Sequence, residues 1–111
     1  MQRDVSYLND IYQSSQKIIA KTSDITFDEF DNDYDLQDIV IRRFTIIGEA
    51  SARLSETFRS KHPQLPYKSM RGLRNFIVHE YNEIDTEIIW KTSREDIPQL
   101  ARVIGEILST F

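Results

Sequence analysis

The stretch YDLQDIVIRRFTIIGEASARLSETFR, residues 34–59, decides the fold. Its apolar residues recur at steps of three, four or seven, which is the spacing of one face of an α-helix. We therefore expect a single helix over residues 34–59, the longest in the chain. The apolar stripe consists of Leu36, Val40, Phe44, Ile47, Leu54 and Phe58, and it is widened by Ile39, Ile46 and Ala50.

Gly48 interrupts this stretch near its middle. A glycine inside a helix costs about 1 kcal/mol relative to alanine, so its presence calls for a reason. We predict that another helix approaches closely at Gly48. The alternative is a glycine tolerated on the surface.

The rest of the chain shows the same helical spacing on both sides of this stretch. Residues 3–21 predict a first helix, and Thr26 with Glu29 three residues later has the spacing of a capping box, which predicts a short helical turn over residues 26–30. Pro66 is well placed to begin a helix that ends between His79 and Asn82. The apolar residues expected to face inward from this third helix are Met70, Leu73, Ile77 and Val78.

The C-terminal part predicts a short segment capped by Asp85 and then a last helix that begins near Ser93 or Asp96. Pro98 is tolerable in the first turn of that helix, where backbone amides lack intrahelical partners. Four main helices with short connections predict an all-α fold, an antiparallel four-helix bundle with short extra helical segments. The 111 residues make one domain, residues 1–111.

Composition excludes several classes of protein. The chain is 40% hydrophobic and 29% charged with 3 Gly and 3 Pro, which is typical of a compact helical domain and not of a disordered chain. It has no Cys, so disulfides, thiol nucleophiles and zinc–thiolate sites are excluded. No run of about 18 apolar residues is present, so we expect a cytoplasmic protein with no membrane partner.

Charge is distributed unevenly along the chain. The net charge of −4 divides into −4 for residues 1–34, +3 for residues 35–82 and −3 for residues 83–111. An acidic total argues against nucleic acid, because binding to phosphates requires Lys and Arg. The basic central segment nevertheless leaves room for a local positive surface.

The candidate site lies within this basic segment. On a helix, Arg71, Asn75 and His79 follow one another at steps of four and share one side. His exchanges a proton near neutral pH, and Arg is suited to clamp a phosphate, so the pair suits phosphodiester cleavage. A structural interpretation stays open, with His79 as a helix-terminal residue and Tyr81 as an ordinary packing aromatic. Arg42 and Arg43 either extend the positive surface or form a solvated helix face.

Several other sites are excluded by their motifs. Residues 31–35 copy the opening of a calcium loop, but Leu36 stands where Gly is needed and Arg42 where the closing Glu is needed. There is no glycine-rich phosphate loop, no zinc-binding His-Glu-x-x-His and no Gly-x-Ser-x-Gly elbow. We expect neither a metal nor a cofactor.

Residues 74–81, RNFIVHEY, resemble the Arg-x4-His-x-Tyr signature of the HepT-like (DUF86) branch of the HEPN superfamily, which comprises toxins of type VII toxin–antitoxin pairs. Residues 37–43, 46–50, 62–63 and 87–90 also resemble this family, so the likeness covers most of the chain from residue 35. It is faint in the first helix.

The resemblance implies a dimeric helical bundle whose two motifs form one metal-independent endoribonuclease site. Arg74 would bind and polarise the scissile phosphate, His79 would act as general acid or base, and Asn75 would orient the histidine or the phosphate. Arg71, Arg42 and Arg43 are candidate RNA contacts. Tyr81 would receive AMP from a cognate MNT-type nucleotidyltransferase antitoxin, and that bulky anionic group would block RNA binding.

Two functions follow from these observations. The first is a ribonuclease toxin acting on RNA as a homodimer. The second is a non-catalytic helical adaptor, or substrate-binding subunit, for a nucleotidyltransferase. The complete ending His79-Glu80-Tyr81 favours the nuclease, because an adaptor has no need of it.

Overall fold

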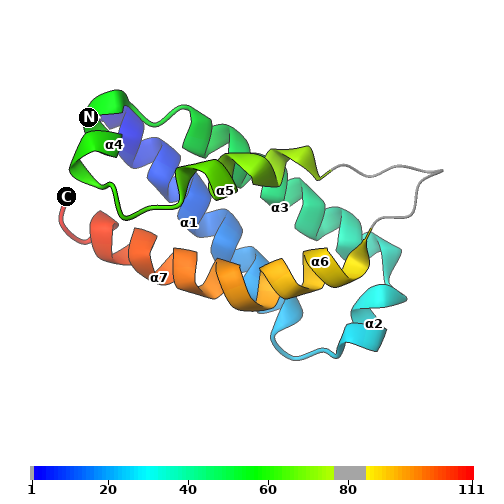
Figure 1. Cartoon of the computed structure of the whole chain (residues 1–111). Coiled ribbons are helices and arrows are strands. Elements are labelled where there is room, and N and C mark those ends of the chain that lie inside the picture. The colour runs from blue at the N-terminus through cyan, green and yellow to red at the C-terminus, as the bar shows by residue number, and fades with distance from the viewer. Residues whose placement is uncertain (1, 77–84) are drawn as a thin grey trace.

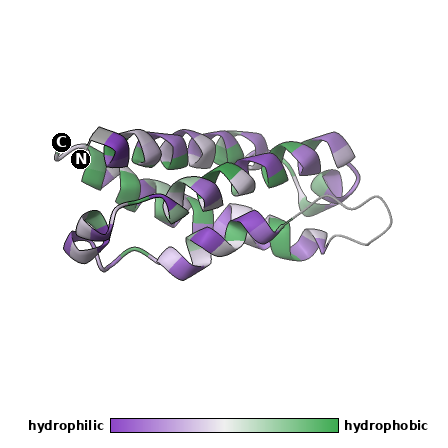
Figure 2. Ribbon diagram, turned by 90° about the horizontal axis from the view of Figure 1, so that it is seen from above, coloured by the Kyte–Doolittle hydropathy of each residue, from purple (hydrophilic) through white to green (hydrophobic). Residues whose placement is uncertain are grey.

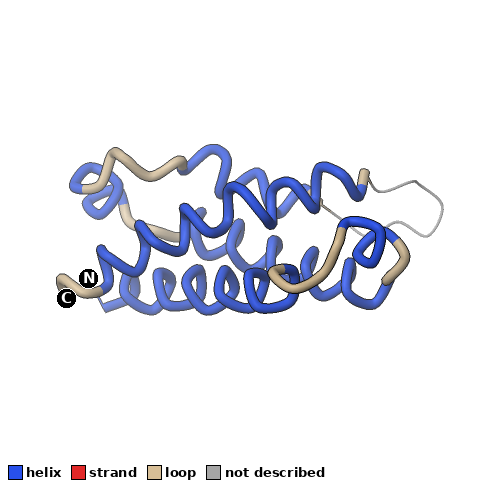
Figure 3. Tube along the Cα trace, turned by 90° about the horizontal axis from the view of Figure 1, so that it is seen from below, coloured by secondary structure: helices blue, strands red, loops and turns tan. Residues whose placement is uncertain are grey.

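A computed structural model describes residues 2–76 and 85–111 of the chain. Within these residues every regular element is helical and no strand occurs (Figure 3). The elements are α1 (Gln2–Thr22), α2 (Phe27–Asp31), α3 (Tyr34–Ala52), α4 (Glu56–Lys61), α5 (Tyr67–Gly72), the 3₁₀ helix η1 (Leu73–Asn75), α6 (Thr86–Lys91), the π-helical segment η2 (Thr92–Asp96) and α7 (Ile97–Leu108).

The elements form an antiparallel bundle, which confirms the predicted fold class. In Figure 1 the chain runs one way along α1, back along α3, forward along α5 and back again along α6 and α7. Both termini lie at the end of the bundle near α4, and α2 lies at the opposite end. The described part of the molecule measures 41 × 28 × 19 Å along its principal axes.

The core lies where α1 packs against α3 and α7. Each of these helices turns an apolar stripe inward and a polar face outward, as the interleaved colours of Figure 2 show. The side chains that are fully buried include Leu8, Ile11, Val40, Phe44, Ile47 and Ile104. These positions confirm the apolar stripes predicted for the first, the long central and the last helix.

The prediction of a single helix over residues 34–59 is wrong, because these residues form two helices. Helix α3 ends at Ala52, and Ser55 caps the separate α4 by accepting a hydrogen bond at its Oγ from the Phe58 amide, at 3.0 Å. The buried carboxylate of Asp4 accepts from the Ser55 amide at 2.8 Å and from its hydroxyl at 2.7 Å. Leu54 remains buried across the break, so the apolar spacing continues and conceals it. With 19 residues, α3 is also shorter than α1, which has 21.

The predicted short segment is confirmed as α6, which Asp85 caps, and the predicted last helix is confirmed as α7, which begins at Ile97. What the sequence did not predict is that these two helices are continuous. Helices α6 and α7 are joined without interruption by η2, in which the Ile97 amide donates to the Thr92 carbonyl five residues earlier. Pro98 follows directly and has no amide to donate. The wider π turn therefore accommodates a proline inside a continuous helix.

The predicted short turn at residues 26–30 is confirmed as α2. Thr26 and Glu29 form the complete capping box, each accepting from the backbone amide of the other. The buried side chain of Gln37 donates to the carbonyls of Phe30 and Asp31 at 2.9 and 3.1 Å. These bonds fix α2 at the start of α3.

Among residues 2–76 and 85–111, no helix is both long and apolar enough to span a bilayer.

Candidate functional site

Helix α5 and η1 carry three of the predicted site residues. Arg71, Arg74 and Asn75 are exposed, whereas the neighbouring apolar residues Met70 and Leu73 are buried. The polar face predicted for Arg71 and Asn75 is therefore present, and Arg74 joins it. We call residues 67–76 the arm. One side of the arm exposes two guanidinium groups and one amide to solvent, and its other side faces the core.

The predicted extent of this helix, to His79 or beyond, is wrong. Pro66 is the N-cap, the α-helix covers six residues and the 3₁₀ turn ends at Asn75. Phe76 has extended backbone angles, φ −74° and ψ 117°, so the helix does not continue through it. The step of four from Asn75 to His79 therefore does not lie on one continuous helix.

His79 and Tyr81 lie outside the described residues, as do Ile77 and Val78 of the predicted inward face. The structure thus places Arg74 and Asn75 of the proposed site. The relation of His79 and Tyr81 to them stays a prediction from the sequence.

The backbone of Arg74 rests directly on Gly48 of α3. A Cβ atom added to Gly48 would lie 2.7 Å from both the amide nitrogen and the Cβ of Arg74, and 3.1 Å from its Cα. Ordinary carbon contacts are about 3.5–4.0 Å, so only glycine fits here. The predicted close approach at Gly48 is confirmed, and the partner is the segment that carries the motif.

Small residues such as Gly48 and Ala50 permit close contact between two copies of a chain only where they are exposed. Both are buried within one copy, and Gly48 is covered by Arg74 of its own chain. They are therefore not available to a second copy in this arrangement.

One aromatic contact and one hydrogen bond anchor the arm that carries Arg74. The Phe76 ring packs edge-on against Phe44 of α3, with ring centroids 5.3 Å apart. At the other end, the Tyr67 hydroxyl donates to the His62 carbonyl at 2.6 Å. Burial raises the pKa of the Tyr67 phenol, and the Arg59 guanidinium lowers it in part. The arm is held at both ends, so Arg74 sits on a fixed support.

The two candidate RNA contacts on α3 differ in accessibility. Arg42 is exposed, whereas Arg43 is half-buried and its Nε is buried with no hydrogen-bond acceptor among the described residues. Arg42 lies six residues before Gly48, which is about 9 Å along the helix axis. Arg42 is therefore the better candidate of the two for a phosphate contact.

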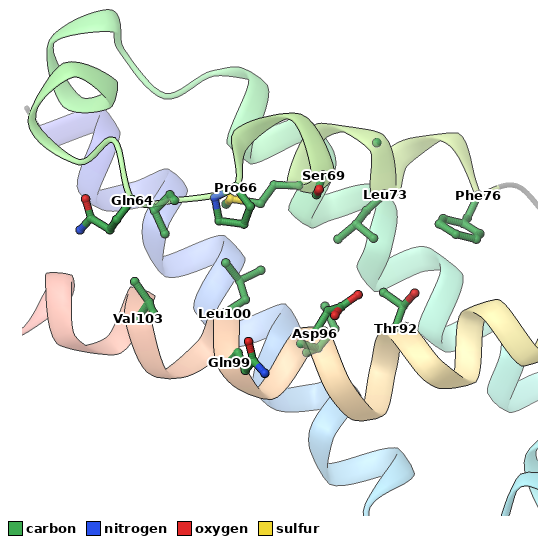
Figure 4. Close-up of a pocket in the computed structure, with 14 residues that line it drawn as sticks. Gln64, Pro66, Ser69, Leu73, Phe76, Thr92, Asp96, Gln99, Leu100 and Val103 are labelled. Atoms are coloured by element: carbon green, nitrogen blue, oxygen red, sulfur yellow. The ribbon is translucent and has the colours of Figure 1, made fainter.

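A groove of about 670 Å³, which the sequence did not predict, lies between the arm and helix α7 (Figure 4). Leu73 and Phe76 face it from one side, and Leu100 and Val103 face it from the other. Asp96 is the one ionisable residue among the described residues that line it, and its negative charge does not suit a phosphate. Apolar spacing predicts that Leu73 faces inward, but spacing alone does not tell whether two apolar faces meet or leave a gap.

A metal site was not expected, and the described residues add no candidate for one. In the part of the chain that the structure describes, no three His, Asp or Glu side chains are grouped closely enough to hold a metal ion. The arm presents to solvent the guanidinium groups of Arg71 and Arg74 and the amide of Asn75.

Comparison with known proteins identifies the family. The family model described as "Ribonuclease HepT-like" matches residues 11–107. The chain is 42% identical over 103 residues to "Putative RNase MJ1380" of Methanocaldococcus jannaschii, covering 92% of this chain and 94% of that protein. It is 39% identical over 94 residues to "Probable ribonuclease HepT" of Thermococcus cleftensis, covering 85% and 86%. No solved structure matches the chain. With a match over nearly its whole length and relatives of its own size, the chain belongs to the HepT-like ribonuclease family.

Proposed function

We propose that this protein is a metal-independent endoribonuclease, acts in the cytoplasm as the toxin of a toxin–antitoxin pair, and uses Arg74 and His79 as its catalytic residues. Family membership supports the nuclease activity. The observation that carries the site is the exposed Arg74 on a support fixed by Gly48. A guanidinium held in this way is pre-organised to meet the charge of a phosphate.

The proposed reaction is a transfer within the RNA. The ribose 2'-OH loses its proton to a general base and attacks the phosphorus, and the bond to the 5'-oxygen breaks. A general acid protonates the departing oxygen, leaving a 2',3'-cyclic phosphate and a free 5'-OH. Arg74 stabilises the charge that develops on the phosphoryl oxygens, and His79 moves the protons. Asn75 orients the His79 side chain or the phosphate.

The test is cleavage of single-stranded RNA in the presence of EDTA. Wild-type protein is expected to leave 2',3'-cyclic phosphate ends, and His79→Ala is expected to lose the activity. His62→Gln is the matched control, because His62 is the other histidine of the chain and packs its ring on Phe58, with centroids 4.5 Å apart. Activity that survives both Arg74→Ala and His79→Ala would contradict the proposal.

We further propose that the active form is a homodimer in which two copies of the basic segment line one cleft. Residues 35–82 carry a net charge of +3, so two copies bring +6 to a cleft while the whole dimer stays acidic. Arg71 and Arg42 are exposed and extend the positive surface around Arg74, with Arg43 as a weaker candidate. Molecular mass in solution tests the dimer, and an active monomer would exclude it.

Neutralisation is proposed to occur by transfer of AMP to Tyr81 from an MNT-type nucleotidyltransferase. The test is the intact mass of the protein expressed with and without the neighbouring nucleotidyltransferase. A gain of whole AMP units that Tyr81→Phe abolishes is expected. Tyr34→Phe is the control, because Tyr34 is 76% exposed and would be modified by a non-selective enzyme. A tight complex with that enzyme and no RNA cleavage under any condition would instead support the adaptor function.

A further inference from the structure

The three glycines of the chain occupy three different environments. A Cβ added at Gly72 meets nothing within 4 Å, and one added at Gly105 meets the edge of the Tyr12 ring at 3.1 Å. At Gly48 the added atom meets the backbone and Cβ of Arg74 at 2.7 Å. A ring edge can turn away, but a backbone can move only with the element that contains it.

The element most able to move is η1, not α3. Helix α3 packs against α1, α2, α5, α6 and η1, so it lies at the centre of the described fold. In contrast, η1 has three residues and is followed by the extended Phe76. A side chain at position 48 would therefore displace Arg74 and its neighbours and leave α3 in place.

The size of that displacement follows from the distances. Restoring an ordinary separation of about 3.5–4.0 Å from 2.7 Å requires a shift of about 1 Å at the Arg74 backbone. A misplacement of this size in a site that depends on orientation lowers the rate about 100-fold. The exposed Arg74 side chain carries such a shift to its guanidinium, since its direction is set by the backbone from which it extends.

We propose that Gly48 is a positioning residue for Arg74. Because position 48 has no side chain, η1 lies directly on α3, and this contact sets where the Arg74 guanidinium meets the scissile phosphate. This inference rests on the proposed function, because it requires Arg74 to act on RNA. Gly48 itself is buried and acts only through Arg74.

The experiment compares Gly48→Ala with Gly72→Ala, the same substitution at two sites. Gly72 has helical angles, φ −63° and ψ −22°, so alanine fits there without strain. Gly72→Ala is expected to keep wild-type cleavage, and Gly48→Ala is expected to lower kcat/KM about 100-fold while circular dichroism still reports the helical fold. Gly105→Ala is a second control, in a helix that does not carry the motif.

A second readout separates positioning from a general structural effect. The affinity of the protein for uncleaved single-stranded RNA is measured as a function of salt concentration. Each phosphate contact contributes about 0.7 to the slope of log affinity against log salt concentration. Gly48→Ala is expected to lower the slope by about this amount per lost contact, as Arg74→Ala does. In the Arg74→Ala background, Gly48→Ala is expected to cause no further loss of affinity.

The outcomes are distinguishable. If Arg74→Ala cleaves RNA normally, the proposed function fails. If Arg74→Ala is inactive but folded Gly48→Ala has wild-type kcat/KM and salt slope, the positioning role alone is overturned. An equal loss of affinity from Gly48→Ala with and without Arg74 also overturns it, because the effect would then be general.

If Gly48→Ala does not fold, a further variant tests whether the position of η1 sets the activity of Arg74. Phe76→Leu weakens the other attachment of η1, the ring contact with Phe44, without adding volume. It is expected to lower kcat/KM and the salt slope in the same direction as predicted for Gly48→Ala. Wild-type values for Phe76→Leu would then count against the inference.

Discussion

Helix α3 packs in different ways against two of its neighbours, α1 and η1. Toward α1, the two helices contribute large, completely buried side chains to the core, among them Leu8 of α1 and Ile47 of α3. Toward η1, the contact at Gly48 depends on the absence of a side chain, and the backbone of Arg74 lies directly against it. The first contact stabilises the fold through buried volume, whereas the second fixes the position of a functional residue. Substitutions at the two contacts should therefore have different consequences.

The largest effect on stability is expected at the α1 contact. Leu8→Ala removes a fully buried side chain and should lower the free energy of unfolding by about 2–5 kcal/mol. Denaturant unfolding measures this loss, and RNA cleavage per folded molecule should stay unchanged. A loss of specific activity matching that of Gly48→Ala would break the distinction between the two contacts.

A smaller loss is expected where α1 meets the break between α3 and α4. Asp4→Ala removes the buried carboxylate that accepts two hydrogen bonds from Ser55, so it should cost about 1–3 kcal/mol. Asp10→Ala is the control, because Asp10 is an exposed carboxylate on the same helix. Equal stability of the two variants would show that the Asp4 contact does not hold the break.

The smallest effect is expected at the base of the arm. Tyr67→Phe removes the hydrogen bond to the His62 carbonyl and should cost about 0.5–1.5 kcal/mol at neutral pH. Burial raises the folded-state pKa of Tyr67 above its ordinary value of 10.0, so the neutral phenol is favoured in the fold. This contribution is complete below pH 10 and is lost as pH rises through the folded pKa. A difference between wild type and variant that persists unchanged at high pH would contradict this assignment.

Periodicity predicted the helices well because each one buries a stripe of side chains. It missed the break at residues 53–55, where Leu54 keeps the apolar spacing while Ser55 caps a new helix and also donates two hydrogen bonds to Asp4, some fifty residues away. It also missed the continuity of α6 and α7, since Pro98 is normally a helix boundary and a π turn is needed to accommodate it. Local spacing does not contain either interaction.

The residues of the candidate site come from the sequence and stay a prediction, whereas their support could not be predicted. The family signature singles out Arg74, the helical spacing includes Asn75, and the cost of a glycine inside a helix singles out Gly48. That Gly48 and Arg74 meet could not be read from the sequence, because they are 26 positions apart and no pattern links them. The groove beside the arm escaped prediction for a related reason, since an apolar stripe looks the same whether or not its partner touches it.

The most direct test of the account is the rate of RNA cleavage in EDTA by Arg74→Ala and Arg102→Ala. Both residues are exposed arginines on helical elements, but Arg102 lies on α7 in the acidic C-terminal segment. The account predicts that Arg74→Ala loses about 100-fold to 1,000-fold in rate, as expected when a group that stabilises transition-state charge is removed, while Arg102→Ala stays near wild type. Equal rates for the two variants would contradict it.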